Sequence, residues 1–238
     1  MSYRRRSNKA NPVSAVKPPF ISYNPHDEKN SPVMKNENII ITSIDPGIVN
    51  CGIYVGCYNT KTKSHQSIFL SRLEFRKDEE SHYVNSLKKL EELEKENKFF
   101  SNSHYILIES QMAISYNNTR MGQHLISFFI TSLRNKGNRP LIIEINSQSK
   151  TRLLDCPKGM KKPEYKKWCK EKALSLLQER EEKDHEEAFI NCIKVAKKSD
   201  DMGDSVCQYY AWICILKGEA VQTPFPFSRE GESLNIRE

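Results

Sequence analysis

The sequence has 238 residues and a formal net charge of +7, from 37 basic and 30 acidic side chains. This length suffices for one domain with a substantial core, and the charge favours a phosphate-rich partner. No apolar run reaches the roughly 18 to 20 residues of a membrane span, so we expect no membrane contact. Seven cysteines without CxxC spacing argue against a zinc site or a disulfide framework, and they favour a reducing, intracellular compartment.

The composition divides the chain into a central domain and two tails. Residues 1–38 are rich in proline, serine, asparagine and basic residues, and we expect a disordered basic arm there. The run Arg4-Arg5-Arg6 fits a phosphate contact, a nuclear signal or an organellar transit peptide. Residues 39–218 form the predicted domain, and residues 219–238 form a C-terminal tail.

The predicted domain begins with three strands. Residues 39–44 are a continuous apolar, β-branched run that Pro46 and Gly47 end, which is typical of a buried strand. Strands at 52–58 and 67–75 follow after short polar connections. The three strands are therefore expected to form an antiparallel meander.

Helices and strands alternate through the rest of the domain. Two more buried strands are predicted at 104–109 and 140–146. The predicted helices cover residues 79–98, residues 119–136 with Thr119 as N-cap, a segment that begins near Pro163, residues 184–195 with Asp184 as cap, and residues 200–218. This order implies an α/β fold with a mixed five-stranded sheet and helices on both faces. The first, fourth and fifth strands should be parallel neighbours at its centre.

Four acidic residues fall where these elements would bring them together. Asp45 and Glu109 each stand at the carboxyl end of a predicted parallel strand, and ligands bind at this edge in open α/β sheets. Asp201 and Asp204 stand at positions i and i+3, on one face of the last predicted helix. This helix is otherwise apolar nearly all round, so its acids should face a specific partner.

Such a cluster predicts a divalent metal site. Crowded carboxylates repel one another and need a cation, and hard oxygen ligands favour Mg²⁺ or Mn²⁺ over zinc. Two ions about 4 Å apart could activate a water molecule and stabilise the leaving oxygen of a phosphodiester. Taken singly, Asp45 could be a turn former, Asp201 part of a helix cap and Glu109 a strand-end charge. The combination of all four acids favours the metal site.

Three short motifs resemble those of a known family. They are "IDPGIVNCGI" at 44–53, "ILIESQ" at 106–111 and "KKSDDMGDS" at 197–205. In this order and setting, they resemble the acidic motifs of the RuvC-like Holliday junction resolvases of poxviruses, other large DNA viruses and fungal mitochondria, within the ribonuclease H-like superfamily. The resemblance covers residues 39–218 in motif order. Ser110 departs from the pattern, because the family typically has a basic residue between the glutamate and the glutamine.

The resemblance implies a ribonuclease H-like fold and a metal-dependent endonuclease that cuts four-way DNA junctions. It assigns Asp45, Glu109, Asp201 and Asp204 as catalytic, metal-binding acids for two Mg²⁺ or Mn²⁺ ions. It also implies a homodimer joined through helix 119–136, which suits paired nicks in a two-fold symmetric substrate.

Several residues near the acids are candidates for DNA contacts. The basic segment 146–172 follows the last predicted strand, so its lysines could contact the phosphate backbone beside the acids. The predicted DNA-contacting residues are Gln111, Lys150, Lys158, Lys161, Lys162, Lys166, Lys167, Lys197 and Lys198. For any single lysine, keeping a helix surface hydrated is an equally good explanation. Met112 and Tyr116 could also contact bases at an opened junction.

Other functions remain open at this stage. A different ribonuclease H-like nuclease would share the acids but cut an RNA–DNA hybrid or a flap. An actin-like or sugar-kinase fold also places an Asp-x-Gly turn after its first strand, although it needs a second nucleotide-binding lobe. A non-catalytic junction-binding protein would not need all four acids. The resemblance favours a viral protein at replication sites in the host cytoplasm or nucleus, with mitochondria as the alternative.

Overall fold

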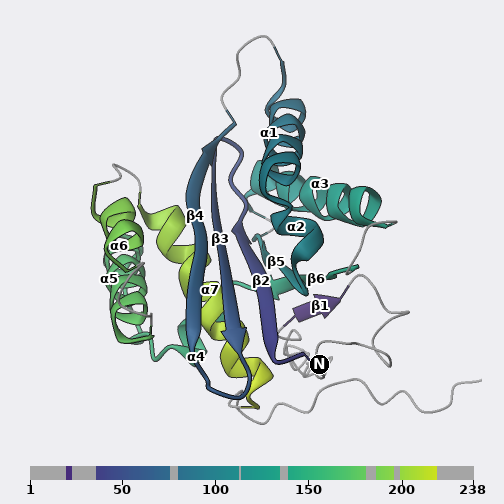
Figure 1. Cartoon of the computed structure of the whole chain (residues 1–238). Coiled ribbons are helices and arrows are strands. Elements are labelled where there is room, and N and C mark those ends of the chain that lie inside the picture. The colour runs from purple at the N-terminus through teal and green to yellow at the C-terminus, as the bar shows by residue number, and fades with distance from the viewer. Residues whose placement is uncertain are drawn as a thin grey trace, which may run out of the picture.

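The computed structural model describes residues 20–22, 36–75, 80–112, 114–134, 139–180, 186–195 and 199–218 (Figure 1). One mixed β-sheet, with a hydrophobic core on each face, organises these residues. Its strands are β1 (Phe20–Ser22), β2 (Asn38–Asp45), β3 (Asn50–Asn59), β4 (His65–Glu74), β5 (Tyr105–Ser110) and β6 (Leu141–Asn146). Hydrogen bonds between neighbours give the order β1-β6-β5-β2-β3-β4.

Strands β2 to β6 form the mixed five-stranded sheet that the sequence predicts. β5 is parallel to both β2 and β6, whereas β3 is antiparallel to both β2 and β4. The predicted meander and parallel centre are therefore confirmed. Short β1 adds a sixth strand, antiparallel to β6, from within the predicted arm 1–38. Most of this arm and all of the predicted tail 219–238 lie outside the described residues.

The central strands are apolar at consecutive positions because both of their faces are covered. Successive strand residues point to opposite faces of the sheet. In β5, Tyr105 and Leu107 enter one core, and Ile106 and Ile108 enter the other. In β2, Ile41 enters the same core as Leu107. Odd-numbered residues of both strands therefore point to one face.

The helices divide between the two faces, as Figure 1 shows. One face carries α1 (His82–Asn97), α2 (Phe99–Asn102) and α3 (Tyr116–Leu133). The other carries α4 (Gln148–Leu153), α5 (Lys162–Arg180), α6 (Glu186–Val195) and α7 (Asp200–Leu216). Helix α7 packs along β2 and β3 and is buried over most of its length, which agrees with its apolar sequence. None of the helices within the described ranges is long and apolar enough to cross a membrane.

The helix boundaries differ from the prediction in a few places. Helix α3 begins at Tyr116 with Ser115 in the N-cap position, so the prediction of Thr119 as the cap is wrong. The Thr119 hydroxyl instead donates to the Ser115 carbonyl oxygen at 3.1 Å, a local bond that threonine makes inside helices as well as at caps. Helices α2 and α4 were not predicted, because they are too short to show a periodic pattern. Asp184 and Lys136 lie outside the described residues.

Candidate active site

Asp45 and Glu109 lie next to each other at the carboxyl edge of the parallel strands. Asp45 is the last residue of β2, and Glu109 is the penultimate residue of β5. The register pairs Ile44 with Ile108, so the two acids occupy equivalent positions on strands about 5 Å apart. Both are odd-numbered, and their side chains therefore point to the face that α7 covers.

The start of α7 lies against these strand ends. β2 and β3 pair Asp45 with Gly52. A β-carbon on Gly52 would lie only 2.1 Å from the backbone oxygen of Asp201, so β3 and the first turn of α7 touch at this point. Further along the helix, the Gln208 side chain donates to the Ile44 carbonyl oxygen at 3.2 Å. These contacts bring the acids of α7 to those of β2 and β5.

A buried lysine completes the cluster. Lys150 of α4 is 4% exposed, and its ammonium group donates to Glu109 Oε2 at 2.6 Å and to Asp204 Oδ1. The sequence suggested that Lys150 would line a groove for the DNA backbone, whereas the structure places it among the acids. Its helix follows β6, whose end lies level with Glu109 in the sheet. That position is the sequence signal that could have located Lys150 in the cluster.

The acid–base properties of the cluster reflect crowded negative charge. Burial first, and then the charges of Glu109 and Asp204, raise the pKa of Asp45 well above its usual value. Burial also raises the pKa of Glu109 against the opposing effect of Lys150, and burial raises the pKa of Asp201 to about 6. Burial alone would lower the pKa of Lys150, but Glu109 and Asp204 outweigh it and raise this pKa well above its usual value.

The cluster holds an ammonium group where the sequence predicts metal ions. No three histidine, cysteine, aspartate or glutamate side chains of the described residues are arranged to hold a metal ion. The donor chemistry nonetheless fits a hard divalent cation, because four carboxylates offer only oxygen ligands, and the Lys150 ammonium group pairs with only two of them, Glu109 and Asp204. The residues that would hold Mg²⁺ or Mn²⁺ are Asp45, Glu109, Asp201 and Asp204.

Helix α5 contacts the acidic start of α7. The Tyr165 hydroxyl donates to Asp204 Oδ1 at 3.3 Å, and the Cys169 thiol lies 3.1 Å from the same oxygen. The sequence did not predict the Cys169 contact. Lys166 forms an ion pair with Asp200. Asp200 is thus engaged toward α5.

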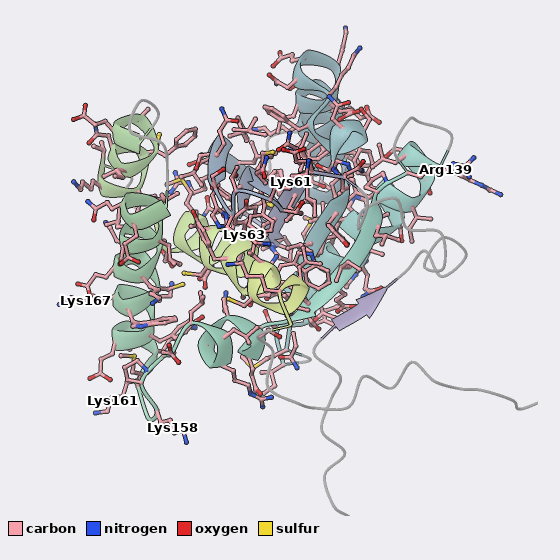
Figure 2. The ribbon with its side chains drawn as sticks, turned by 60° about the horizontal axis from the view of Figure 1, so that its bottom comes forward. Lys61, Lys63, Arg139, Lys158, Lys161 and Lys167 are labelled. Carbon is pink, nitrogen blue, oxygen red and sulfur yellow. The ribbon has the colours of Figure 1, made fainter. Side chains whose placement is uncertain are left out.

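Most of the predicted DNA-contacting lysines lie on the surface. Lys158, Lys161, Lys162, Lys166 and Lys167 are exposed. In Figure 2, the labelled Lys158, Lys161 and Lys167 project outward from α5 and the turn that precedes it. Gln111 is half-buried just beyond β5, and Lys197 and Lys198 lie outside the described residues.

A loop with exposed apolar side chains follows Glu109. Met112, Ile114 and Tyr116 are 71%, 95% and 67% exposed. The Arg120 guanidinium lies 5.5 Å from the centroid of the Tyr116 ring. Large apolar side chains exposed this close together often mark a binding surface. The loop therefore extends the candidate site beyond the acids.

The helix predicted to join two subunits, residues 119–136, corresponds to α3. Of the aromatic residues of this helix, Phe129 is fully buried in the core of its own chain, and Phe128 is half-buried against that core. The exposed residues of α3 are mainly polar: Tyr116, Asn117, Arg120, Gln123, Ser127, Ile130 and Thr131. The homodimer through this helix stays a prediction.

The chain has a ribonuclease H-like α/β fold of the RuvC type. Three solved Holliday junction resolvases share this fold. The fowlpox virus enzyme is 18% identical with a TM-score of 0.51, covering 75% of this chain and 99% of that chain. The yeast mitochondrial enzyme Ydc2 is 16% identical with a TM-score of 0.51, covering 78% and 86%. Thermus thermophilus RuvC in complex with a Holliday junction is 9% identical with a TM-score of 0.50, covering 76% and 96%.

The similarity at the sequence level is more restricted. No protein-family model matches the chain. Uncharacterized protein 97L of Invertebrate iridescent virus 3 is 26% identical over 126 residues, which are 53% of this chain. The match spans 56% of the length of that viral protein. The chain thus shares its fold with solved resolvases and part of its sequence with a virus-encoded protein.

Proposed function

We propose that the protein is a metal-dependent endonuclease that resolves four-way DNA junctions by paired, symmetric nicks. The convergence of Asp45, Glu109, Asp201 and Asp204 at one edge of a resolvase-type sheet carries this proposal. Acids gathered in a half-buried cluster cost folding free energy, because each loses hydration and repels the others. Their joint presence on three separate elements therefore supports a functional site.

The chain's own residues would bind and orient the reacting groups. The four acids would hold divalent cations, which supply stabilisation for the charge that develops on the scissile phosphate. Lys150 donates to both Glu109 and Asp204 and so fixes the separation of these two carboxylates. Gln208 holds the end of β2 against α7 through the Ile44 carbonyl. The site is thereby organised before a substrate arrives.

The surroundings of the acids support branched DNA as the substrate. Exposed lysines on and before α5, such as Lys158 and Lys161, can contact the phosphate backbone without regard to sequence. Exposed Met112 and Ile114 suit bases that are unstacked at a branch point, whereas an intact duplex hides its bases in a stack. Together these surfaces favour a junction over a linear duplex.

Paired nicking requires two active sites, and we therefore propose a homodimer that uses α3. The fowlpox and Thermus resolvases have each been crystallised with Holliday junction DNA, which supports the same partner for this chain. The similarity to an iridescent virus protein supports a viral origin. We accordingly place the activity at sites of viral genome replication inside the host cell.

The proposal is tested by incubating the protein with a synthetic four-way junction and Mg²⁺ or Mn²⁺, beside linear duplex, flap and RNA–DNA hybrid substrates. We expect symmetric nicks in the junction and none with Asp45→Asn, which removes one metal-binding charge. Asp155→Asn is the matched control, because Asp155 is exposed and has φ 57°, a conformation that asparagine tolerates. Equal cutting of duplex or hybrid would contradict the junction preference but not the nuclease activity. ATP hydrolysis without DNA cleavage would contradict both.

A further inference from the structure

We infer that Tyr165 is a positioning residue that sets the orientation of the Asp204 carboxylate for cation binding. The inference rests on the proposed function, because it assigns Asp204 as a metal ligand. It goes further by giving α5 a part in the metal site, whereas the sequence predicted only DNA contacts for the basic segment 146–172 that contains Tyr165.

The donors to Asp204 all meet one of its two carboxylate oxygens. Oδ1 receives the Tyr165 hydroxyl at 3.3 Å, the Cys169 thiol at 3.1 Å and the Lys150 ammonium group. Within the described parts of the chain, no donor contacts Oδ2. The protein therefore occupies one oxygen and presents the other, which is the arrangement expected of a carboxylate prepared to bind a cation through a single oxygen.

Helix α5 is built to bring Tyr165 to this position. Tyr165 and Cys169 are four residues apart and so lie on one helical face, the face toward α7. A β-carbon on Gly203 would lie 3.3 Å from the Lys170 α-carbon, so the two helix backbones approach closely beside Asp204. The Tyr165 ring stacks on Trp168 at a centroid distance of 5.8 Å and an interplanar angle of 29°. The hydroxyl is thus placed by packing and not by a freely rotating side chain.

Lys167 points away from the metal-binding acids, whereas Lys166 reaches back to Asp200 at the start of α7. In the run "YKKWC" at 165–169, Tyr165 is half-buried and Cys169 is buried, whereas Lys166 and Lys167 are exposed. Lys167 projects from the outer side of the helix in Figure 2. One short segment therefore serves two surfaces. Lys167 faces the solvent, where DNA would lie, and Tyr165 with Cys169 faces the metal-binding acids.

The substitution Tyr165→Phe isolates the positioning role, because it removes the hydroxyl and keeps the stacked ring. We expect the affinity for Mn²⁺ in the absence of DNA, measured by calorimetry, to fall by about tenfold, as is typical when a partner of a metal ligand is removed. The junction affinity measured without divalent metal should stay unchanged. At saturating junction, the single-turnover cleavage rate should fall, and a higher Mn²⁺ concentration should restore part of it.

Tyr54→Phe is the matched control, since it also removes a buried hydroxyl, the one bonded to Ser67 Oγ at 2.7 Å, away from the acids. It should leave Mn²⁺ affinity unchanged. Unchanged Mn²⁺ affinity in Tyr165→Phe, or an equal loss in Tyr54→Phe, would overturn the inference, as would weaker junction binding with normal metal affinity. If the wild-type protein binds Mn²⁺ but does not cut junctions, the proposed function fails, while the Mn²⁺ titration still decides the role of Tyr165.

Discussion

Lys150 is a charged side chain in a place where lysine rarely occurs. It is 4% exposed, and the carboxylates of Glu109 and Asp204 offset the cost of removing its ammonium group from water. The same ammonium group reduces the repulsion among the four acids. Lys150 thus stabilises a cluster that would otherwise oppose folding.

Replacing Lys150 with methionine should expose that contribution. The variant keeps the volume of the side chain but leaves two half-buried carboxylates without their cation, so we expect the free energy of unfolding to fall by about 3 kcal/mol. Urea unfolding at neutral pH measures the loss. Added Mg²⁺ should recover part of it, because a cation bound to the folded state stabilises that state. A variant as stable as the wild type would show that the acids do not depend on Lys150.

His104 provides a test of pH dependence away from the acids. The Ile40 backbone N–H donates to its Nδ1 at 3.0 Å, which requires the neutral ring, and burial lowers the pKa of His104 below the usual 6.5. The unfolded chain therefore binds this proton more readily than the folded one. The stabilising contribution of neutral His104 is complete above pH 6.5 and is lost as the pH falls through and below this value.

Urea unfolding at pH 7.5 and pH 5.5 compares the wild type with His104→Gln. The wild type should lose more stability on acidification than the variant, because only the wild type must protonate this ring in the unfolded state. An equal loss in both proteins would show that His104 does not contribute to the pH dependence.

At the scale of elements, the site depends on how closely α7 approaches the sheet. Gly52 lets β3 touch the backbone of Asp201, and Gly203 lets α5 approach α7 next to Asp204. Two glycines therefore lie against the two acids of α7, one on each side. Close backbone contacts at these glycines hold the start of α7 in place. The side chains of Asp201 and Asp204 are therefore left to face the other acids.

Gly52→Ala tests this approach of strand and helix. Its β-carbon would lie 2.1 Å from Asp201 O, so the start of α7 must move, and we expect a loss of about 1–3 kcal/mol in unfolding free energy. Junction cleavage should fall further than stability explains, since Asp201 moves away from Asp45. Gly122→Ala is the control, because its β-carbon would meet only Pro46 Cγ at 3.8 Å. Normal cleavage by Gly52→Ala would contradict the close contact.

At the scale of the whole molecule, the position of positive charge matters more than its total. Lys158 and Lys161 lie in the turn before α5, whereas Lys61 and Lys63 lie in the turn between β3 and β4 (Figure 2). In β2, the register places Asn38 opposite Asn59, so that turn is at the end of β2 away from Asp45. If DNA binds with its scissile phosphate at the acids, we therefore expect contacts from Lys158 and Lys161 and none from Lys61 and Lys63.

Two double variants with the same change in net charge separate these surfaces. Lys158→Gln with Lys161→Gln should reduce the slope of log affinity against log salt by about 0.9 for each lost phosphate contact. Lys61→Gln with Lys63→Gln should leave the slope unchanged. Junction binding across a range of salt concentrations gives both slopes. Equal effects of the two variants would mean that the charge acts through the net field and not through local contacts.

Local patterns in the sequence predict most of the fold. Apolar β-branched runs predicted the five main strands, and the order of strands and helices predicted the mixed sheet with its parallel centre. The convergence of the four acids was also predicted, because each stands at the end of a strand or the start of a helix, and the topology brings those ends together. Their catalytic role stays a prediction. The strands, the helices and the acids at their ends are each defined by residues close together in the chain, so they can be predicted from the sequence.

Only the tertiary structure decided which side chains support the acids. A lysine in a basic segment predicts a surface position, yet Lys150 is buried between Glu109 and Asp204, which lie 41 and 54 positions away. Tyr165 and Cys169 lie in the basic segment 146–172, for which the sequence predicted only DNA contacts, yet they contact Asp204. Such contacts form when helices distant in sequence pack together. The free energy of burying a charge or a hydroxyl depends on the partner groups that packing brings to it. Local sequence patterns do not predict these partners.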